Sequence, residues 1–176
     1  MNDIDLSIPK GAIFSDDRKY RYALWRCWNP SLPPLAVIGL NPSSANEIKD
    51  DATITRLMGR AEQNGFGGLL MGNLYAFVST NPALLLSVND TVGIHNDDYL
   101  KMMIGMAGRT LCGWGSFKPV KRRSPIVLAM ITEPYCLGVN ADGQPKHPLY
   151  ISYDTTMIRY CNVLHKGVKN EGTGIF

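Results

Sequence analysis

Three short polar segments of this sequence carry residue types that could do chemistry. The first is the run Gly39-Leu40-Asn41-Pro42-Ser43-Ser44, which directly follows an apolar stretch. Its glycine permits close approach of a ligand, its proline stiffens the turn, and its amide and hydroxyl groups can donate or accept hydrogen bonds. Asn-Pro-Ser is also ordinary turn chemistry, so a purely structural role is the alternative for this segment.

The second segment is a single polar residue, Asn73, in the otherwise apolar stretch 69–77. A buried amide without partners costs about 1–3 kcal/mol, so Asn73 must find them. An amide offers one donor group and one acceptor, which suits the edge of a nucleobase. Backbone groups are the alternative partners.

The third segment places His147 between Lys146 and Pro148, after a turn at Asp142-Gly143. A histidine held in this way can donate a proton or bind an anion. We therefore predict catalytic roles for Asn41 and His147. Ligand contacts are predicted for Asn73 and a further set of residues: Gly39, Leu40, Pro42, Ser43, Ser44, Tyr75 and Lys146.

The sequence lacks the motifs typical of zinc or redox cysteines, of phosphate-binding loops and of serine nucleophiles. The four cysteines, at positions 27, 112, 136 and 161, form no C-x-x-C pair, and neither a Gly-x-x-x-x-Gly-Lys loop nor a Gly-x-Ser-x-Gly elbow occurs. We expect no metal and no cofactor. Asp50 and Asp51 are expected to cap a helix, with a catalytic or metal-binding role as the alternative.

The elements that would position these residues alternate between strand and helix. The apolar run 35–40 is typical of a strand covered on both faces, and apolar residues recur at helical spacing between 50 and 65. A strand over 69–77 completes a βαβ unit. Further elements are a strand near a sheet edge at 19–28, a short helix at 84–87, a helix at 96–108, a strand at 110–115, and a segment at 126–130 that is helix or strand.

This order predicts an α/β protein: a single-domain three-layer sandwich with a mainly parallel central sheet. Residues 19–161 would form the domain, after an N-terminal extension (1–18) and before a C-terminal tail (162–176). Ligands of such sheets bind outside the carboxyl ends of the strands. All three polar segments are candidates for that edge.

Composition sets few limits on function. The 176 residues are 45% hydrophobic with a formal net charge of +3, which neither requires nor excludes a polyanionic partner. No stretch of eighteen apolar residues and no signal peptide is recognisable, so we expect a cytoplasmic protein with no membrane contact. The oligomeric state stays open.

Five motifs occur in an order that resembles the domain-of-unknown-function family 1643. They are Asn41-Pro42-Ser43, Asp51-Ala52-Thr53-Ile54, Gly72-Asn73-Leu74-Tyr75-Ala76, Gly113-Trp114-Gly115 and Lys146-His147-Pro148-Leu149-Tyr150. The resemblance spans roughly residues 20–155 and implies no activity.

A more distant resemblance is to the uracil-DNA glycosylase superfamily. Residues 39–43 are similar to its Gly-x-(Asn/Asp/Glu)-Pro-Gly motif, Asn73 to its pyrimidine-reading asparagine, and His147 to the histidine of its His-Pro-Ser loop. Ser43 and Leu149 depart from the family's glycine and serine. The resemblance implies a glycosylase-like fold in which Asn41 positions water, Asn73 reads the base and His147 stabilises the departing base.

The sequence thus favours a glycosylase-like hydrolase acting on a nucleobase, such as a modified pyrimidine, in DNA or in a nucleotide. Stacking on the base could come from Tyr75, Phe77 or Trp114. The alternative is a non-catalytic domain that binds a nucleotide or a small phosphorylated ligand.

Overall fold

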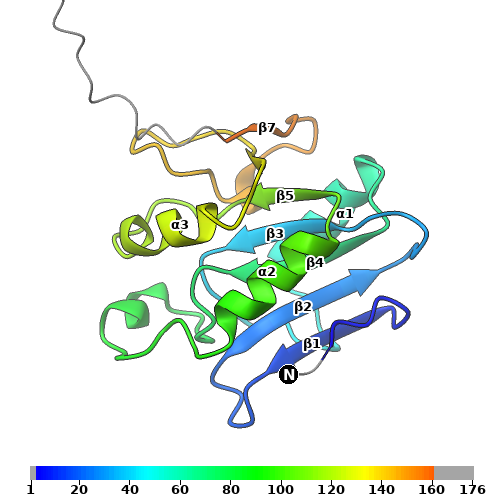
Figure 1. Ribbon diagram of the computed structural model, residues 1–176. Helices are drawn as coiled ribbons and strands as arrows, with labels where there is room; N and C mark the ends of the chain where they lie inside the picture. Colours follow the sequence, from blue (N-terminus) through cyan, green and yellow to red (C-terminus); the bar gives the residue numbers. More distant parts are fainter. Residues whose placement is uncertain (1–2, 161–176) are drawn as a thin grey trace, which may run out of the picture.

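Strand β3 (Leu35–Gly39) lies at the centre of a single sheet in the computed structural model, which describes residues 3–160. The strand order within this part of the chain is β1-β2-β4-β3-β5-β6-β7 (Figure 1). The other strands are β1 (Lys10–Phe14), β2 (Arg21–Cys27), β4 (Gly68–Asn73), β5 (Arg109–Cys112), β6 (Pro134–Cys136) and β7 (Ile158–Arg159).

The sheet is mixed, so the prediction of a mainly parallel sheet is wrong. The inner pairs β4–β3, β3–β5 and β5–β6 are parallel, whereas β1–β2, β2–β4 and β6–β7 are antiparallel. A short turn joins β1 to β2, and a connection of that length permits only an antiparallel pair. The apolar βαβ pattern of the inner strands gave no sign of these antiparallel flanks.

Helices cover both faces of the sheet (Figure 1). Helix α1 (Ala52–Gln63) packs on one face, and α2 (Asn96–Met106) and α3 (Val120–Leu128) pack on the other. Two short 3-10 helices, η1 (Pro82–Leu86) and η2 (Pro148–Tyr150), lie in the connections. The result is a three-layer α/β arrangement.

The side chains of β3 explain its uninterrupted apolar run. Leu35 and Val37 join the core under α1, while Ala36 and Ile38 join the core under α2, and all four are fully buried. Burying a side chain of the size of leucine or isoleucine stabilises the fold by about 1.5–3 kcal/mol. The central strand is therefore anchored from both faces, which makes its end a rigid base for a site.

Several element boundaries differ from the expected ones. Residues 10–14, expected within an N-terminal extension, form β1, so the sheet begins earlier in the chain and the 19–28 segment is its second strand. The segment 126–130 lies mainly in α3, and β4 ends at Asn73. The expected tail at 162–176 lies outside the described residues.

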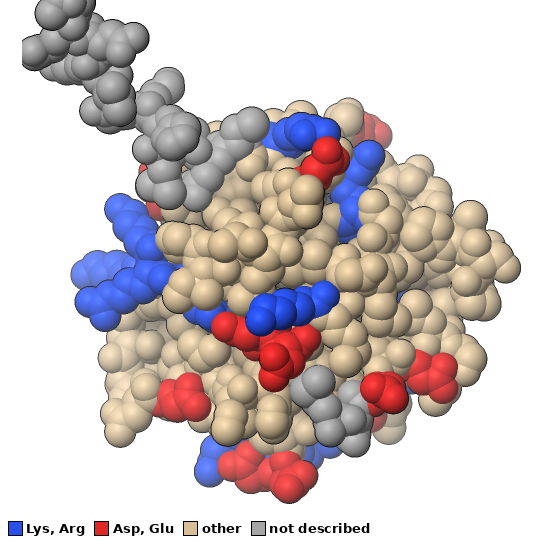
Figure 2. Space-filling model, in the orientation of Figure 1, with Lys and Arg blue, Asp and Glu red and all other residues tan. Residues whose placement is uncertain are grey.

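Charged groups are scattered over the face drawn in Figure 2. Basic side chains gather most densely beside α3, where Lys118, Lys121 and Arg122 are exposed. No helix in the described part of the chain is long and apolar enough to cross a membrane.

Candidate functional site

A cavity of about 230 Å³ opens at the carboxyl ends of β3, β4 and β5, three neighbouring parallel strands. The chain leaves β3 for α1 on one face and reaches β5 through α2 on the other, and such a change of face is where α/β sheets bind ligands. The lining residues are Arg21, Gly39, Leu40, Asn41, Ser43, Asp51, Thr53, Ile54, Met71, Asn73, Ser79, Thr80, Pro82, Trp114 and His147.

Asn41, Asn73 and His147 thus line one cavity, although they are up to about a hundred residues apart in the sequence. The volume is below the ~300–1,000 Å³ of typical sites for drug-sized ligands. A small ligand built around one ring of nucleobase size is the scale that such a space accommodates.

Asn73 occupies the floor of the cavity at the last position of β4. Its side chain is 1% exposed, and neither Nδ2 nor Oδ1 has a hydrogen-bond partner among the described residues. The alternative that backbone groups satisfy this amide is therefore not what the structure shows. A donor and an acceptor, side by side and buried, are free to meet a ligand.

Gly39 makes room for that amide. The two residues are paired in the parallel β3–β4 register, and a Cβ atom at position 39 would lie 2.9 Å from Asn73 Oδ1 and 2.6 Å from Met71 Cε. Real side chains essentially never approach so closely. The glycine of the first motif is thus required for the orientation of the second motif's asparagine.

The amide of Asn41 has a fixed orientation. Nδ2 donates to the carbonyl oxygens of Pro42 (3.0 Å) and Ser79 (2.8 Å). Since carbonyl oxygens only accept, the nitrogen must point toward them, which leaves Oδ1 as the free acceptor. This oxygen can accept a hydrogen bond from a water molecule or a ligand.

His147 is held as a neutral donor. Its Nδ1 accepts a hydrogen bond from the backbone N–H of Leu149 (3.3 Å) at the start of η2. In the neutral ring the proton then resides on Nε2. Burial lowers the pKa of His147, and the charge of Asp51 opposes this shift only in part. At neutral pH the residue therefore offers an uncharged N–H.

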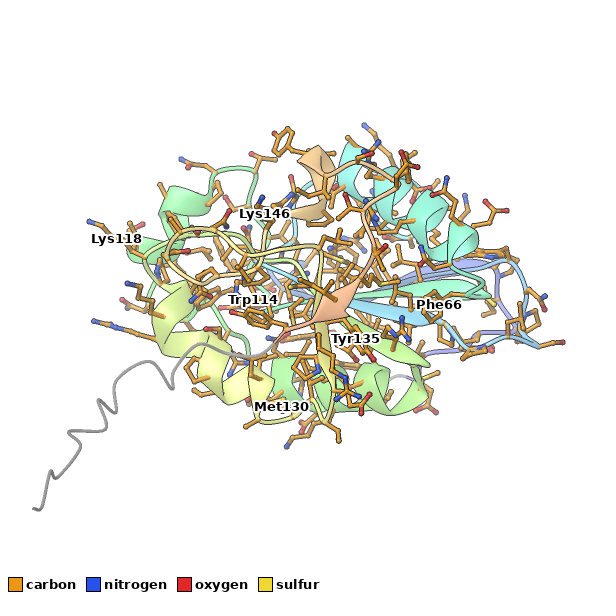
Figure 3. The ribbon with its side chains drawn as sticks, turned by 90° about the horizontal axis from the view of Figure 1, so that it is seen from above. Phe66, Trp114, Lys118, Met130, Tyr135 and Lys146 are labelled. Atoms are coloured by element: carbon orange, nitrogen blue, oxygen red, sulfur yellow. The ribbon has the colours of Figure 1, made fainter. Side chains whose placement is uncertain are left out.

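The turn after β5 positions His147. Gly115 donates its N–H to Pro145 O (3.0 Å), and at Gly113 a Cβ atom would lie 2.9 Å from Pro148 Cδ. Between them Trp114 is 1% exposed, lines the cavity and donates Nε1–H to Gln144 (2.9 Å). Figure 3 shows Trp114 in the interior, whereas Lys118 extends from the periphery. Of the three aromatic residues considered for stacking, Trp114 alone is part of the lining.

Sequence reasoning missed Arg21, the first residue of β2. Because β2 runs antiparallel to β4, its beginning lies at the edge where β4 ends. Arg21 is 3% exposed, lines the cavity and donates Nη1–H to Ala45 O (2.7 Å). The sequence shows an arginine within an aromatic strand segment. Its place in the cavity could be predicted only if the order of the strands in the sheet were known.

Asp51 both caps helix α1 and lines the cavity, two placements that were alternatives on the sequence alone. Its Oδ1 accepts from Ile54 N (2.9 Å) as the N-cap of α1, as expected, and the residue also lines the cavity. Asp50 instead forms an ion pair with Arg26 (2.6 Å) and is absent from the lining.

Four predicted ligand contacts do not line this cavity. Pro42 is buried, Ser44 is exposed, and Tyr75 is buried with its hydroxyl donating to Pro119 O (2.8 Å). Lys146 is exposed and lines a second, more open pocket that shares only His147 with the cavity. Each lies within two residues of a lining residue in sequence, but successive side chains of a strand or turn point in different directions.

Within residues 3–160 no group of three or more His, Cys, Asp or Glu side chains is placed to hold a metal ion. Cys27 and Cys112 are free thiols. Burial raises the pKa of the Cys112 thiol, which keeps it protonated.

Residues 21–149 match a family profile described as "Protein of unknown function (DUF1643)". Comparisons with curated proteins and with solved structures gave no match. The uracil-DNA-glycosylase-like fold is therefore supported by no comparison, and the likeness of the three motifs contributes only to a proposal.

Proposed function

We propose that this chain, which belongs to the DUF1643 family, is a glycosylase-like hydrolase that cleaves the bond between a nucleobase and its sugar. The substrate would be a base, such as a modified pyrimidine, in DNA or in a nucleotide. The observation that carries the proposal is the buried, unpaired amide of Asn73 in a cavity that also contains Asn41 and His147.

An unpaired donor and acceptor at 1% exposure disfavour the empty state of the cavity. The edge of a pyrimidine carries an acceptor next to a donor, as in the carbonyl and ring N–H of uracil, which is the complement of an amide. Trp114 supplies an aromatic wall for the same ring. These features support recognition of a flat, hydrogen-bonding heterocycle.

Two further groups support hydrolysis. The free Oδ1 of Asn41 can orient a water molecule, and the Nε2–H of His147 can donate to an oxygen of the base. As the carbon–nitrogen bond breaks, its electron pair leaves with the base, and the water oxygen bonds to the sugar carbon. The proton of that water ends on the base or in solvent. A donor aimed at developing negative charge is worth about 10²–10³ in rate.

The amide of Asn41 is a poor base, so the reaction would be slow or limited to bases that leave easily. The test is the release of free base from modified or mismatched oligonucleotides and from nucleotides. Asn41→Ala and His147→Ala are expected to lower release by about 10²-fold or more. His95→Ala, at an exposed residue outside the cavity, is the control. Equal release by the wild type and both site variants would overturn the proposal.

The absence of a carboxylate at position 41 favours a second candidate, a non-catalytic domain that binds a nucleotide or a small phosphorylated ligand in this cavity. Differential scanning calorimetry with a nucleotide panel separates the two. Stabilisation of the folded state without turnover indicates the binding domain, because a ligand stabilises the state that it binds. Stabilisation accompanied by base release indicates the hydrolase.

A further inference from the structure

Arg21 differs from the other buried arginines in how its guanidinium group is bonded. Arg26, on the same strand and also 3% exposed, bonds Asp50 and three backbone carbonyls. Arg123 bonds Asp97 and Leu74 O, and Arg60 bonds four carbonyls through its two Nη atoms. Each of these three groups holds parts of the fold together.

Arg21 has a single such bond, from Nη1 to Ala45 O. Nε is buried with no partner, and among residues 3–160 Nη2 has no hydrogen-bond partner either. The Nε–H and one Nη2–H lie along one edge of the guanidinium plane. This edge is the fork that binds the two oxygens of a carboxylate or a phosphate.

No carboxylate of the described residues forms an ion pair with Arg21. Burial lowers the pKa of Arg21 to about 10, and Asp51 opposes the shift. The side chain therefore remains charged at neutral pH. One oxygen of Asp51 is already bonded to the first turn of α1. A buried cation without a direct counter-ion is costly unless an anion joins it.

We infer that the cavity takes a small anionic ligand whose carboxylate or phosphate binds the Nε/Nη2 edge of Arg21. The inference deepens the proposed function and rests on it for the base that Asn73 contacts. A phosphate inside a continuous nucleic-acid strand needs room for chain on both sides, whereas Arg21 is 3% exposed in a cavity of about 230 Å³. The anion is thus a ring carboxylate or the terminal phosphate of a free nucleotide, and not a phosphate inside a nucleic-acid strand.

Titration calorimetry on the full-length protein tests this with four probes: uracil, uracil carrying a ring carboxylate, uridine 5′-monophosphate and inorganic phosphate. The buffer contains no phosphate, sulfate or carboxylate. We expect at least one of the two anionic pyrimidines to bind about 10- to 100-fold more tightly than uracil, the range for a charge-assisted pair. Preference for the ring carboxylate or for the nucleotide identifies the source of the anion.

The variants Arg21→Gln and Arg21→Lys separate charge from geometry. Arg21→Gln retains an N–H donor on a shorter side chain but loses the charge, so the advantage of the anionic probe over uracil should disappear. Arg21→Lys retains the charge without the fork and should keep only part of the advantage. Arg122→Gln removes an exposed charge outside the cavity and should leave binding unchanged. If Arg21→Gln unfolds, Arg21→Lys provides the comparison.

The outcomes distinguish this inference from the proposed function. Uracil binding that depends on Asn73, with no preference for either anionic pyrimidine, overturns the inference and leaves the proposed function intact. An Arg21-dependent gain for phosphate alone, with no pyrimidine bound, supports the anion subsite and contradicts the proposed function. An equal preference for anions in the wild type and Arg21→Gln overturns the inference, as does the absence of any anion binding.

Discussion

Gly39 and Asn73 face each other across the parallel β3–β4 pair, and the missing side chain at position 39 leaves the space that the amide of Asn73 occupies. This relationship joins the two motifs that form the floor of the cavity. It also explains why the first motif begins with glycine. Its peptide needs no unusual backbone conformation, since Gly39 is absent from the residues with positive φ.

The substitution Gly39→Ala should displace Asn73 and the end of Met71, with a loss of about 1–3 kcal/mol in the free energy of unfolding, as for other overpacked sites. Ligand affinity should fall with it. Gly105→Ala is the matched control, because Gly105 lies in α2 with no atom within 4 Å of an added Cβ. That change should stabilise the protein by about 0.5–1 kcal/mol. Denaturant unfolding of both variants measures the two effects. Equal effects would contradict the proposed crowding.

The substitutions Asn73→Leu and Asn96→Leu should differ in their effect on stability. Asn73→Leu removes two unpaired buried atoms, so the ligand-free protein should lose nothing or gain about 1 kcal/mol. Asn96 is fully buried and donates to the carbonyls of Asn73 and Leu74, so its replacement should cost about 1–3 kcal/mol. Urea unfolding without ligand measures both. A large loss for Asn73→Leu would show that the amide is structural.

Acid should weaken the fold through His147. Burial depresses the pKa of this residue in the folded state, so the unfolded chain takes up the proton first as pH falls. The contribution of His147 to stability is complete above its unfolded pKa of about 6.5 and is lost as pH falls through the lower folded value. Unfolding measured between pH 5 and 8 should show this slope. His147→Gln should flatten it, and His95→Gln should not.

The segment Ile151–Thr155 should depend on Arg60 for its position. Arg60 is fully buried, and its Nη atoms bond the carbonyls of Ile151, Ser152, Tyr153 and Thr155. Arg60→Met would leave these carbonyls unpaired, and we expect a loss of about 2–4 kcal/mol in the free energy of unfolding. Glu62→Met, in the same helix but exposed, is the control for a change to methionine. Similar losses for both would contradict this anchoring role.

The sequence alone predicted the inner part of the fold well. The apolar run at β3, the helical spacing and Asp51 cap of α1, and the glycine stop before β4 are local signals, because they depend on residues close in the chain. The convergence of Asn41, Asn73 and His147 followed from their positions after parallel strands. These parts of the site can be predicted from hydrophobic periodicity and from the residue types typical of turns.

The remaining features depend on contacts between distant segments. The place of Arg21 in the cavity required the antiparallel β2–β4 pair, which no local pattern specifies. Tyr75 and Lys146 were predicted as ligand contacts because they belong to the motifs of Asn73 and His147, but their side chains line other pockets. The orientation of a side chain after a strand end is set by tertiary packing.

The central claim is that Asn73 pairs with the edge of a base inside the cavity. The most direct test is calorimetric titration of the wild type and Asn73→Leu with neutral and anionic pyrimidines. We expect at least one pyrimidine to bind the wild type and Asn73→Leu to bind it about 10- to 100-fold more weakly, since the hydrogen bonds of a buried amide are lost. Unchanged affinity in Asn73→Leu, or the absence of binding by the wild type to every pyrimidine, would contradict the claim.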